Sequence, residues 1–268
     1  MKNAATLKTG PTILGVDFSG AVHAGEKIWV SRAQFDGKML RFDFLGRAAD
    51  LPGGSPDRTE AISALRNWIS IHQGAACGLD FPFALQKEAL VESDYATWLQ
   101  NFVSRYPNSQ KMKESGFGAR RATDIAAKTP FSPLNLRLYR QTYHGIGEVL
   151  APLRASGACV LPFDAPISQK IWLLEICPAS LLKAEKLYLS YKGKSDLQRR
   201  NREIIAREMA ARTPFEWNLE MEKRAIDDTE GDALDAILAA ICTFNALQKP
   251  GSLTARSELE SKEGRVYF

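Results

Sequence analysis

Four aspartates are the residues of this chain whose spacing most strongly suggests chemistry. Asp17 lies in the apolar segment ILGVDFSG, Asp80 in the similar segment CGLDFPF, and Asp232 and Asp235 in GDALDAIL. Carboxylates without histidine or thiol partners favour hard cations such as Mg²⁺ or Mn²⁺. Two such ions, about 3.5–4 Å apart, stabilise the attacking and leaving oxygens of phosphodiester cleavage. The four residues therefore predict a two-metal catalytic site for phosphodiester hydrolysis.

Each aspartate also has a purely structural interpretation. Asp17 and Asp80 could each form an Asx turn with the backbone that follows. The segment TEGD at 229–232 resembles a helix capping box, and for Asp232 taken alone capping is the favoured interpretation. Asp235 is harder to explain in this way because it lies inside an alanine- and isoleucine-rich helix. Four separate explanations would have to hold together, so a shared site accounts for the pattern better.

Two further acids follow apolar segments. Glu175 ends the apolar part of WLLEICPAS, where it either completes the metal shell or pairs with a lysine or arginine. Asp164, in LPFDAPIS, resembles Asp80, but the Asp-Ala-Pro sequence favours a turn between adjacent strands. We therefore expect Glu175 to be a candidate metal ligand and Asp164 to be structural.

The segments that must position these residues predict a sheet with helices. Strands are expected at 12–19, 27–35 and 39–46, the last two joined by the hairpin signal Asp36-Gly37. A Pro- and Gly-rich break at 52–56 precedes an amphipathic helix, and the next segment is apolar throughout, as in a central parallel strand. If the strands of Asp17 and Asp80 are parallel neighbours, both carboxylates lie at their carboxyl ends, where open α/β sheets bind ligands.

The rest of the chain predicts a helical and loop insertion at about 86–145, two strands, and further helices. The order β-β-β-α-β differs from the β-α-β start of a doubly wound nucleotide-binding fold. It predicts an α/β fold, namely an RNase H-like mixed sheet flanked by helices, as a single domain over 1–268 with the insertion after the Asp80 strand.

Composition limits the class of protein. The chain has 268 residues, of which 45% are hydrophobic and 25% charged, as in an ordinary globular domain. No apolar run approaches the roughly 18 residues of a membrane span, and the N-terminus lacks a secretory h-region. Four cysteines without CxxC spacing predict buried reduced thiols in a cytoplasmic protein, and a zinc site is not expected. The net charge of +4 is compatible with a nucleic-acid partner without requiring one.

Six segments carry a resemblance to a known family. In chain order they are GVDFSG, GLDFPF, EICPASLL, YKGK, DDTEGDALDAILAA and EGRVYF. They resemble the blocks of the family called domain of unknown function 429, whose members are predicted to be RNase H-like nucleases. The helix DALDAILAA is also similar to the DxxD helix of RuvC-type Holliday junction resolvases. The resemblance implies that Asp17, Asp80, Asp232 and Asp235 bind Mg²⁺ or Mn²⁺ in a nuclease, and Glu175 matches a further family position.

Three residues are expected to contact the substrate, which would be DNA or RNA. They are Ser19 in GVDFSG, Arg121 in RRATD and Lys192 in YKGK. Arg121 and Lys192 also belong to two basic runs, at 111–121 and 192–202, of a kind that usually forms solvated helix faces.

Two other functions remain open. An actin- or sugar-kinase-like phosphotransferase or ATPase shares this strand order, with the backbone of Ser19 and Gly20 around a phosphate. Against it, the second half of the chain lacks a matching glycine-rich phosphate loop. A non-catalytic binding protein could keep the same fold and part of the acidic site. A serine hydrolase is not expected because no GxSxG segment occurs.

Overall fold

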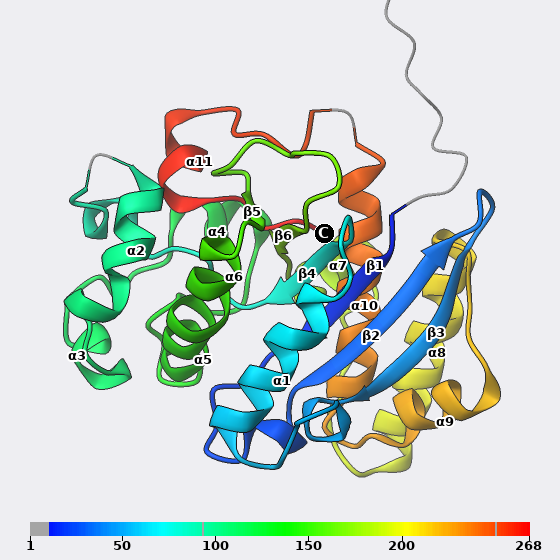
Figure 1. The fold of residues 1–268 in the computed structure, drawn as a ribbon. Coiled ribbons are helices and arrows are strands. Elements are labelled where there is room, and N and C mark those ends of the chain that lie inside the picture. The colour runs from blue at the N-terminus through cyan, green and yellow to red at the C-terminus, as the bar shows by residue number, and fades with distance from the viewer. Residues whose placement is uncertain (1–10, 93, 250) are drawn as a thin grey trace, which may run out of the picture.

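A seven-stranded mixed sheet with helices on both faces forms the framework of the protein (Figure 1). The computed structural model describes residues 11–92, 94–249 and 251–268, so the first ten residues of the predicted domain lie outside the described part. Along the sheet the strands follow the order β5-β6-β4-β1-β2-β3-β7. The strands are β1 (Ile13–Asp17), β2 (Trp29–Phe35), β3 (Leu40–Arg47), β4 (Ala76–Asp80), β5 (Cys159–Leu161), β6 (Trp172–Glu175) and β7 (Phe215–Glu216).

The predicted hairpin and the predicted central strand are both present. Strands β1, β2 and β3 pair antiparallel, and the β2–β3 turn is closed by Asp36, whose Oδ1 accepts the N–H groups of Lys38 and Met39 at 2.9 and 3.0 Å. Gly37 in this turn has φ +94°, which favours glycine. Strand β4 pairs parallel with both β1 and β6, and its covered position explains why its sequence is apolar without alternation.

Two hydrophobic cores lie on opposite faces of the sheet. One contains α1, α2, α5 and α6, and the other contains α7, α8, α9 and α10 (Figure 1). Within 86–145 the described residues form helices and loops but no strand. The helices are α1 (Arg58–Ser70), α2 (Tyr95–Arg105), α3 (Ser109–Lys113), α4 (Ala122–Ala127), α5 (Tyr139–His144), which continues through a π-helical turn into α6 (Ala151–Ala155), α7 (Pro178–Ala184), α8 (Asp196–Arg212), α9 (Leu219–Asp227), α10 (Asp232–Leu247) and α11 (Glu258–Glu263).

Helix α10 packs directly against two glycines of the sheet. Gly15 of β1 and Gly78 of β4 are register partners. A Cβ on Gly15 would lie 2.2 Å from the carbonyl oxygen of Ala236, and one on Gly78 would lie 2.0 Å from Thr243 Oγ1. A larger residue at Gly15 would therefore collide with the helix backbone, and one at Gly78 with the Thr243 side chain.

The C-terminal segment ends beside the sheet. The expected edge strand or anchoring tail in EGRVYF is a single parallel bridge between Tyr267 and Ile176, with the Tyr267 N–H donating to the Glu175 carbonyl at 2.9 Å. All four cysteines are buried free thiols, as the sequence predicts. None of the helices in the described ranges combines the length and apolar character that crossing a bilayer requires.

Candidate functional site

The alternation of strand residues brings Asp17 and Asp80 onto the face that α10 covers. In β1, Leu14 and Val16 belong to the core on the α1 side, so Ile13, Gly15 and Asp17 face α10. The same alternation in β4 places Gly78 and then Asp80 on that face. Asp17 and Asp80 are themselves register partners in the parallel β1–β4 pair. Each aspartate therefore lies at the end of its strand, just beyond the part that α10 covers.

Helix α10 contributes the other two aspartates, and the capping interpretation of Asp232 is wrong. Gly231 is the N-cap residue, with φ +77°, and no side chain at that position caps the helix. Asp228 takes the capping role instead, because its Oδ2 accepts the Ala233 N–H at 2.9 Å. Asp232 is thereby free for other contacts, and Asp235, one turn further on, is 4% exposed.

A lysine joins the two helix carboxylates. The Nζ atom of Lys192 lies 2.8 Å from Asp235 Oδ2 and 3.0 Å from Asp232 Oδ1. The hydroxyl of Tyr191 donates to the remaining oxygen of Asp235, Oδ1, at 2.7 Å. Lys192, expected to contact substrate, is thus engaged with the acidic group itself, and Tyr191 is a site residue that sequence reasoning missed.

A buried arginine holds this lysine segment in place. Arg202 of α8 donates from Nη1 to the carbonyls of Tyr191 and Gly193 at 2.6 and 3.1 Å, and from Nε to the Ile226 carbonyl at 2.6 Å. It is only 2% exposed. From the sequence we assigned Arg202 to a solvated basic run, although its spacing from nearby apolar residues indicates a buried position. Arg202 shares a helix face with the buried residues Ile205, Ala206 and Met209.

The two strand carboxylates differ from the helix pair in their direct contacts. In the described part of the chain, no donor hydrogen-bonds to the carboxylate of Asp17 or Asp80, and no cation forms an ion pair with either. Asp17 is nevertheless only 9% exposed. Burial, reinforced by the charge of Asp232 and opposed by that of Lys192, raises the pKa of Asp17 well above its ordinary value. Burial and the charge of Asp235 likewise raise the pKa of Asp80, again against the opposing charge of Lys192.

The pKa values of Asp232 and Lys192 are shifted by burial and by the neighbouring charges as well. Burial raises the pKa of Asp232 to about 6, although Lys192 opposes the shift. For Lys192, burial alone would lower the pKa, but the carboxylates of Asp235 and Asp17 together raise it above its ordinary value. The lysine is therefore a firmly charged ammonium among carboxylates that are difficult to ionise together.

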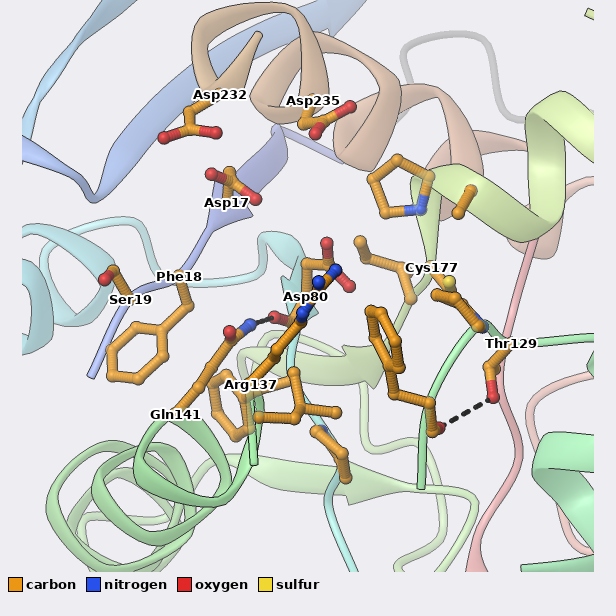
Figure 2. A pocket seen from close by; sticks show the side chains of 18 of the residues that line it. Asp17, Phe18, Ser19, Asp80, Thr129, Arg137, Gln141, Cys177, Asp232 and Asp235 are labelled. Atoms are coloured by element: carbon orange, nitrogen blue, oxygen red, sulfur yellow. Dashed lines mark hydrogen bonds between the residues drawn. The ribbon is translucent and has the colours of Figure 1, made fainter. Parts of the chain in front are cut away.

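All four aspartates open into one cavity of about 620 Å³, where Figure 2 shows them around a common hollow. Its lining includes every predicted site residue, namely Asp17, Ser19, Asp80, Arg121, Glu175, Lys192, Asp232 and Asp235. Over residues 11–92, 94–249 and 251–268, no three His, Cys, Asp or Glu side chains are already gathered as the ligands of a metal ion. The acids share the cavity as two pairs, one on the strands and one on α10.

Glu175 lies at the edge of this cavity and is committed to another contact. Its neighbour Leu174 faces the α10 core and Leu173 the opposite core, so alternation turns Glu175 away from the aspartates. Its Oε2 accepts the Phe83 N–H at 2.8 Å, and both of its oxygens accept from Arg121. Burial raises the pKa of Glu175, and the charge of Arg121 opposes the shift. Of the two roles expected for Glu175, the structure displays the arginine pair.

Arg121, expected to contact substrate, instead directs all five of its N–H donors to protein acceptors. It is fully buried. Nε and Nη2 donate to Asp124, Nη1 and Nη2 donate to Glu175, and Nη1 also reaches the Glu263 carbonyl at 3.0 Å. Arg121 therefore ties α4, β6 and the C-terminal segment together beneath the cavity.

The mouth of the cavity contains polar groups of a different kind. Ser19 lines it, and its Oγ accepts the Ala21 N–H at 3.3 Å. Arg137 extends into the same hollow from the connection between α4 and α5 (Figure 2), with its guanidinium 5.7 Å from the ring centroid of Phe131. Gln141 donates to the main-chain carbonyl of Asp80. Arg137 and Gln141 lie in the insertion, where no motif in the sequence pointed to them.

Comparison of the chain with protein-family models, with curated proteins and with solved structures gave no match. The geometry and charge of the cavity are therefore the basis on which a function is assigned.

Proposed function

We propose that this protein is a divalent-metal-dependent nuclease that hydrolyses phosphodiester bonds in DNA or RNA. One observation carries the proposal. Asp17 and Asp80 lie side by side at the ends of two parallel strands, Asp17 is 9% exposed, and neither carboxylate accepts a hydrogen bond or forms a direct ion pair among the described residues. A buried carboxylate is unfavourable unless a cation or hydrogen bonds compensate it. A cation supplied from solution meets that need.

The donor set fits a hard divalent cation such as Mg²⁺ or Mn²⁺. Asp17 and Asp80 offer carboxylate oxygens that no protein donor occupies, and Asp232 and Asp235 lie across the same cavity. Oxygen donors without histidine or thiolate are typical of Mg²⁺ and Mn²⁺ sites. When bound, such a cation neutralises the charge that develops on phosphate oxygens during cleavage. Asp17 and Asp80 would hold this cation at the ends of their strands.

The topology supports the same proposal. Strands β3, β2, β1, β4, β6 and β5 are adjacent in that order, with the first three antiparallel and the rest parallel. Such a sheet, with an acid on the first strand and another on the next parallel strand, agrees with an RNase H-like fold. The helix with the DxxD spacing packs directly over these two strands. The resemblance to domain of unknown function 429 implies the same fold and activity.

The cavity also offers a cation for the substrate. Among the described residues, no carboxylate lies within ion-pair distance of Arg137, whereas Lys27 at the same mouth is 2.7 Å from Glu230. A guanidinium without an acidic partner is suited to bidentate phosphate binding. The volume of about 620 Å³ lies in the range of pockets that enclose a small ligand. We assign Arg137 to a substrate phosphate and Ser19 to the rim of the site.

The test is a cleavage assay of the purified full-length chain on end-labelled single-stranded DNA, duplex DNA, a four-way junction and RNA. Products should form with Mg²⁺ or Mn²⁺ and not with EDTA. Asp17→Asn and Asp235→Asn should each abolish cleavage, because each removes one charge from the acidic group at almost constant volume.

The matched control is Asp43→Asn, an exposed aspartate that pairs with Arg32 on β2, and it should cleave like the unaltered protein. Full activity in either Asp17→Asn or Asp235→Asn would overturn the proposal. Tight Mg²⁺-dependent binding of ATP, with no cleavage of any nucleic acid, would favour a phosphotransferase or ATPase instead.

A further inference from the structure

We infer that the site takes a single divalent ion, held at Asp17 and Asp80, and that the ammonium of Lys192 supplies the second positive charge at Asp232 and Asp235. This inference rests on the proposed nuclease function and replaces the two-ion arrangement that the sequence predicts. It gives Lys192 a role inside the acidic group, as an internal counter-cation, in place of a substrate contact.

The first support is the unequal occupation of the carboxylate oxygens. On α10, Asp235 Oδ1 accepts from Tyr191, and Asp235 Oδ2 and Asp232 Oδ1 lie 2.8 and 3.0 Å from Lys192 Nζ. On the strands, within the residues described, the oxygens of Asp17 and Asp80 have no such donors. An ion at the strand pair displaces nothing, whereas an ion at the helix pair must first displace the lysine. The strand pair is therefore the cation site.

The second support is that the lysine segment is built into the fold. Arg202 holds the carbonyls on both sides of Lys192, and the Gly193 N–H donates to the Thr229 carbonyl at 2.6 Å. Gly231 leaves room for the segment, because a Cβ there would lie 2.9 Å from the Tyr191 ring and 3.2 Å from Lys192 Cγ. Lys192 is half-exposed, yet its backbone is fixed over the start of α10. A lysine that only contacted substrate at the surface would not need a fixed backbone.

The third support is the charge count. With all four carboxylates ionised, as metal binding requires, the ammonium leaves the group at −3, and one divalent ion brings it to −1. A second divalent ion beside Lys192 would compete with the ammonium for the same oxygens and repel it. One ion plus the lysine therefore leaves a net charge of −1 without two cations competing for the same carboxylate oxygens.

The experiment counts Mn²⁺ ions bound to the metal-free full-length chain, by isothermal titration calorimetry and by loss of the free Mn²⁺ signal in electron paramagnetic resonance. The unaltered protein should bind one ion. Lys192→Met should bind a second ion, or bind its first at least about tenfold more tightly, because a unit positive charge beside the site has been removed. Lys192→Arg, which keeps the charge, should bind one ion.

The matched control is Lys194→Met, which removes the same charge two residues away from an exposed side chain, and its ion count and affinity should match those of the unaltered protein. Two ions in the unaltered protein, with metal-dependent cleavage intact, would overturn this inference and leave the nuclease proposal standing. Unchanged count and affinity in Lys192→Met would also overturn it. No bound Mn²⁺ in the unaltered protein, together with cleavage in EDTA, would overturn both proposals.

Discussion

Asp17 and Asp80 are register partners on adjacent parallel strands, and each lies two residues beyond a glycine on which helix α10 rests. The glycines let the helix approach the strands closely, and the aspartates lie just beyond the part of the strands that the helix covers. The same alternation that buries Gly15 and Gly78 thus delivers both carboxylates to the cavity beside Asp235. This relationship accounts for a charge at the end of each of two core strands.

Removal of one strand carboxylate should weaken metal binding but stabilise the metal-free fold. Asp17→Asn or Asp80→Asn should abolish Mn²⁺ binding and, in metal-free protein at pH 7, raise the free energy of unfolding. The raised pKa of each group means that ionisation opposes folding, and one pKa unit corresponds to about 1.4 kcal/mol. We expect a gain of about 1 kcal/mol or more by chemical denaturation in EDTA. A loss of stability in both variants would show that these carboxylates have structural partners.

The close approach of α10 should depend on Gly15. Gly15→Ala places a methyl group against the Ala236 carbonyl, so the helix must retreat and take Asp235 with it. Overpacking typically costs about 1–3 kcal/mol, and contact with rigid backbone favours the upper end. Mn²⁺ affinity should fall together with the denaturation midpoint. Gly118→Ala is the control, because nothing lies within 4 Å of its added Cβ, and a Gly15→Ala protein equal to it would contradict the packing argument.

The metal-free and metal-bound forms should respond oppositely to pH. Asp17, Asp80 and Asp232 have raised pKa values, about 6 for Asp232 against an ordinary 3.8. The folded state therefore binds more protons than the unfolded chain between those values. The stability that protonation of these groups provides is fully present below about pH 4 and is lost as pH rises through the folded pKa.

Thermal unfolding at pH 4.5 to 8 measures this behaviour. In EDTA, the contribution of the acidic group should fall as pH rises, and the stabilisation gained by adding Mn²⁺ should grow over the same range, because metal binding requires ionised carboxylates. Aspartate-to-asparagine variants at 17 and 80 should lose most of both trends. Mn²⁺ stabilisation that is equally large at pH 4.5 and pH 8 would contradict the prediction.

Arg121 should be a stability residue and not a substrate contact. Arg121→Met leaves Glu175 and Asp124 buried without their cation, a change that typically costs about 3–5 kcal/mol. The Mn²⁺ count of the folded variant should stay the same, because Glu175 faces away from the strand aspartates. The neighbouring exposed Arg120→Met should cost only about 0.5 kcal/mol. Loss of substrate binding without loss of stability in Arg121→Met would restore its predicted substrate role.

Arg137 should act on the substrate alone. Arg137→Ala should raise KM for nucleic acid about tenfold, or about 1.4 kcal/mol, and reduce the salt dependence of binding by about one phosphate contact. Mn²⁺ affinity and the denaturation midpoint should not change. The control for charge is Arg200→Ala, which removes an exposed arginine of α8. Equal KM values and salt slopes in the two variants would remove Arg137 from the site.

The sheet order near the site and the four aspartates were accessible from the sequence because each depends on local pattern. Apolar strands, the Asp36-Gly37 turn and the DxxD spacing placed Asp17 and Asp80 at neighbouring strand ends and the other pair on one helix. The orientation of Glu175 was also accessible in principle. Alternation from Leu173 predicts that it faces the opposite side of the sheet, and only its position at a strand end suggested a metal ligand.

Other features depend on contacts between distant segments, which one sequence does not reveal. Lys192 reaches Asp232 and Asp235 across forty residues because Arg202 fixes its backbone from another helix. Asp228, and not Asp232, caps α10 because Gly231 adopts a left-handed conformation. The placement of Arg137 follows from the path of the insertion, which no turn or periodicity in the sequence specified.

The most direct test of the central claim is the anomalous scattering of a crystal soaked in Mn²⁺. The account predicts one strong peak within ligand distance of the carboxylates of Asp17 and Asp80, with Lys192 still in contact with Asp232 and Asp235. A crystal of the Asp17→Asn variant should lose this peak. A fully soaked crystal of the unaltered protein with no anomalous peak in the cavity, or with Mn²⁺ bound only elsewhere, would contradict the account.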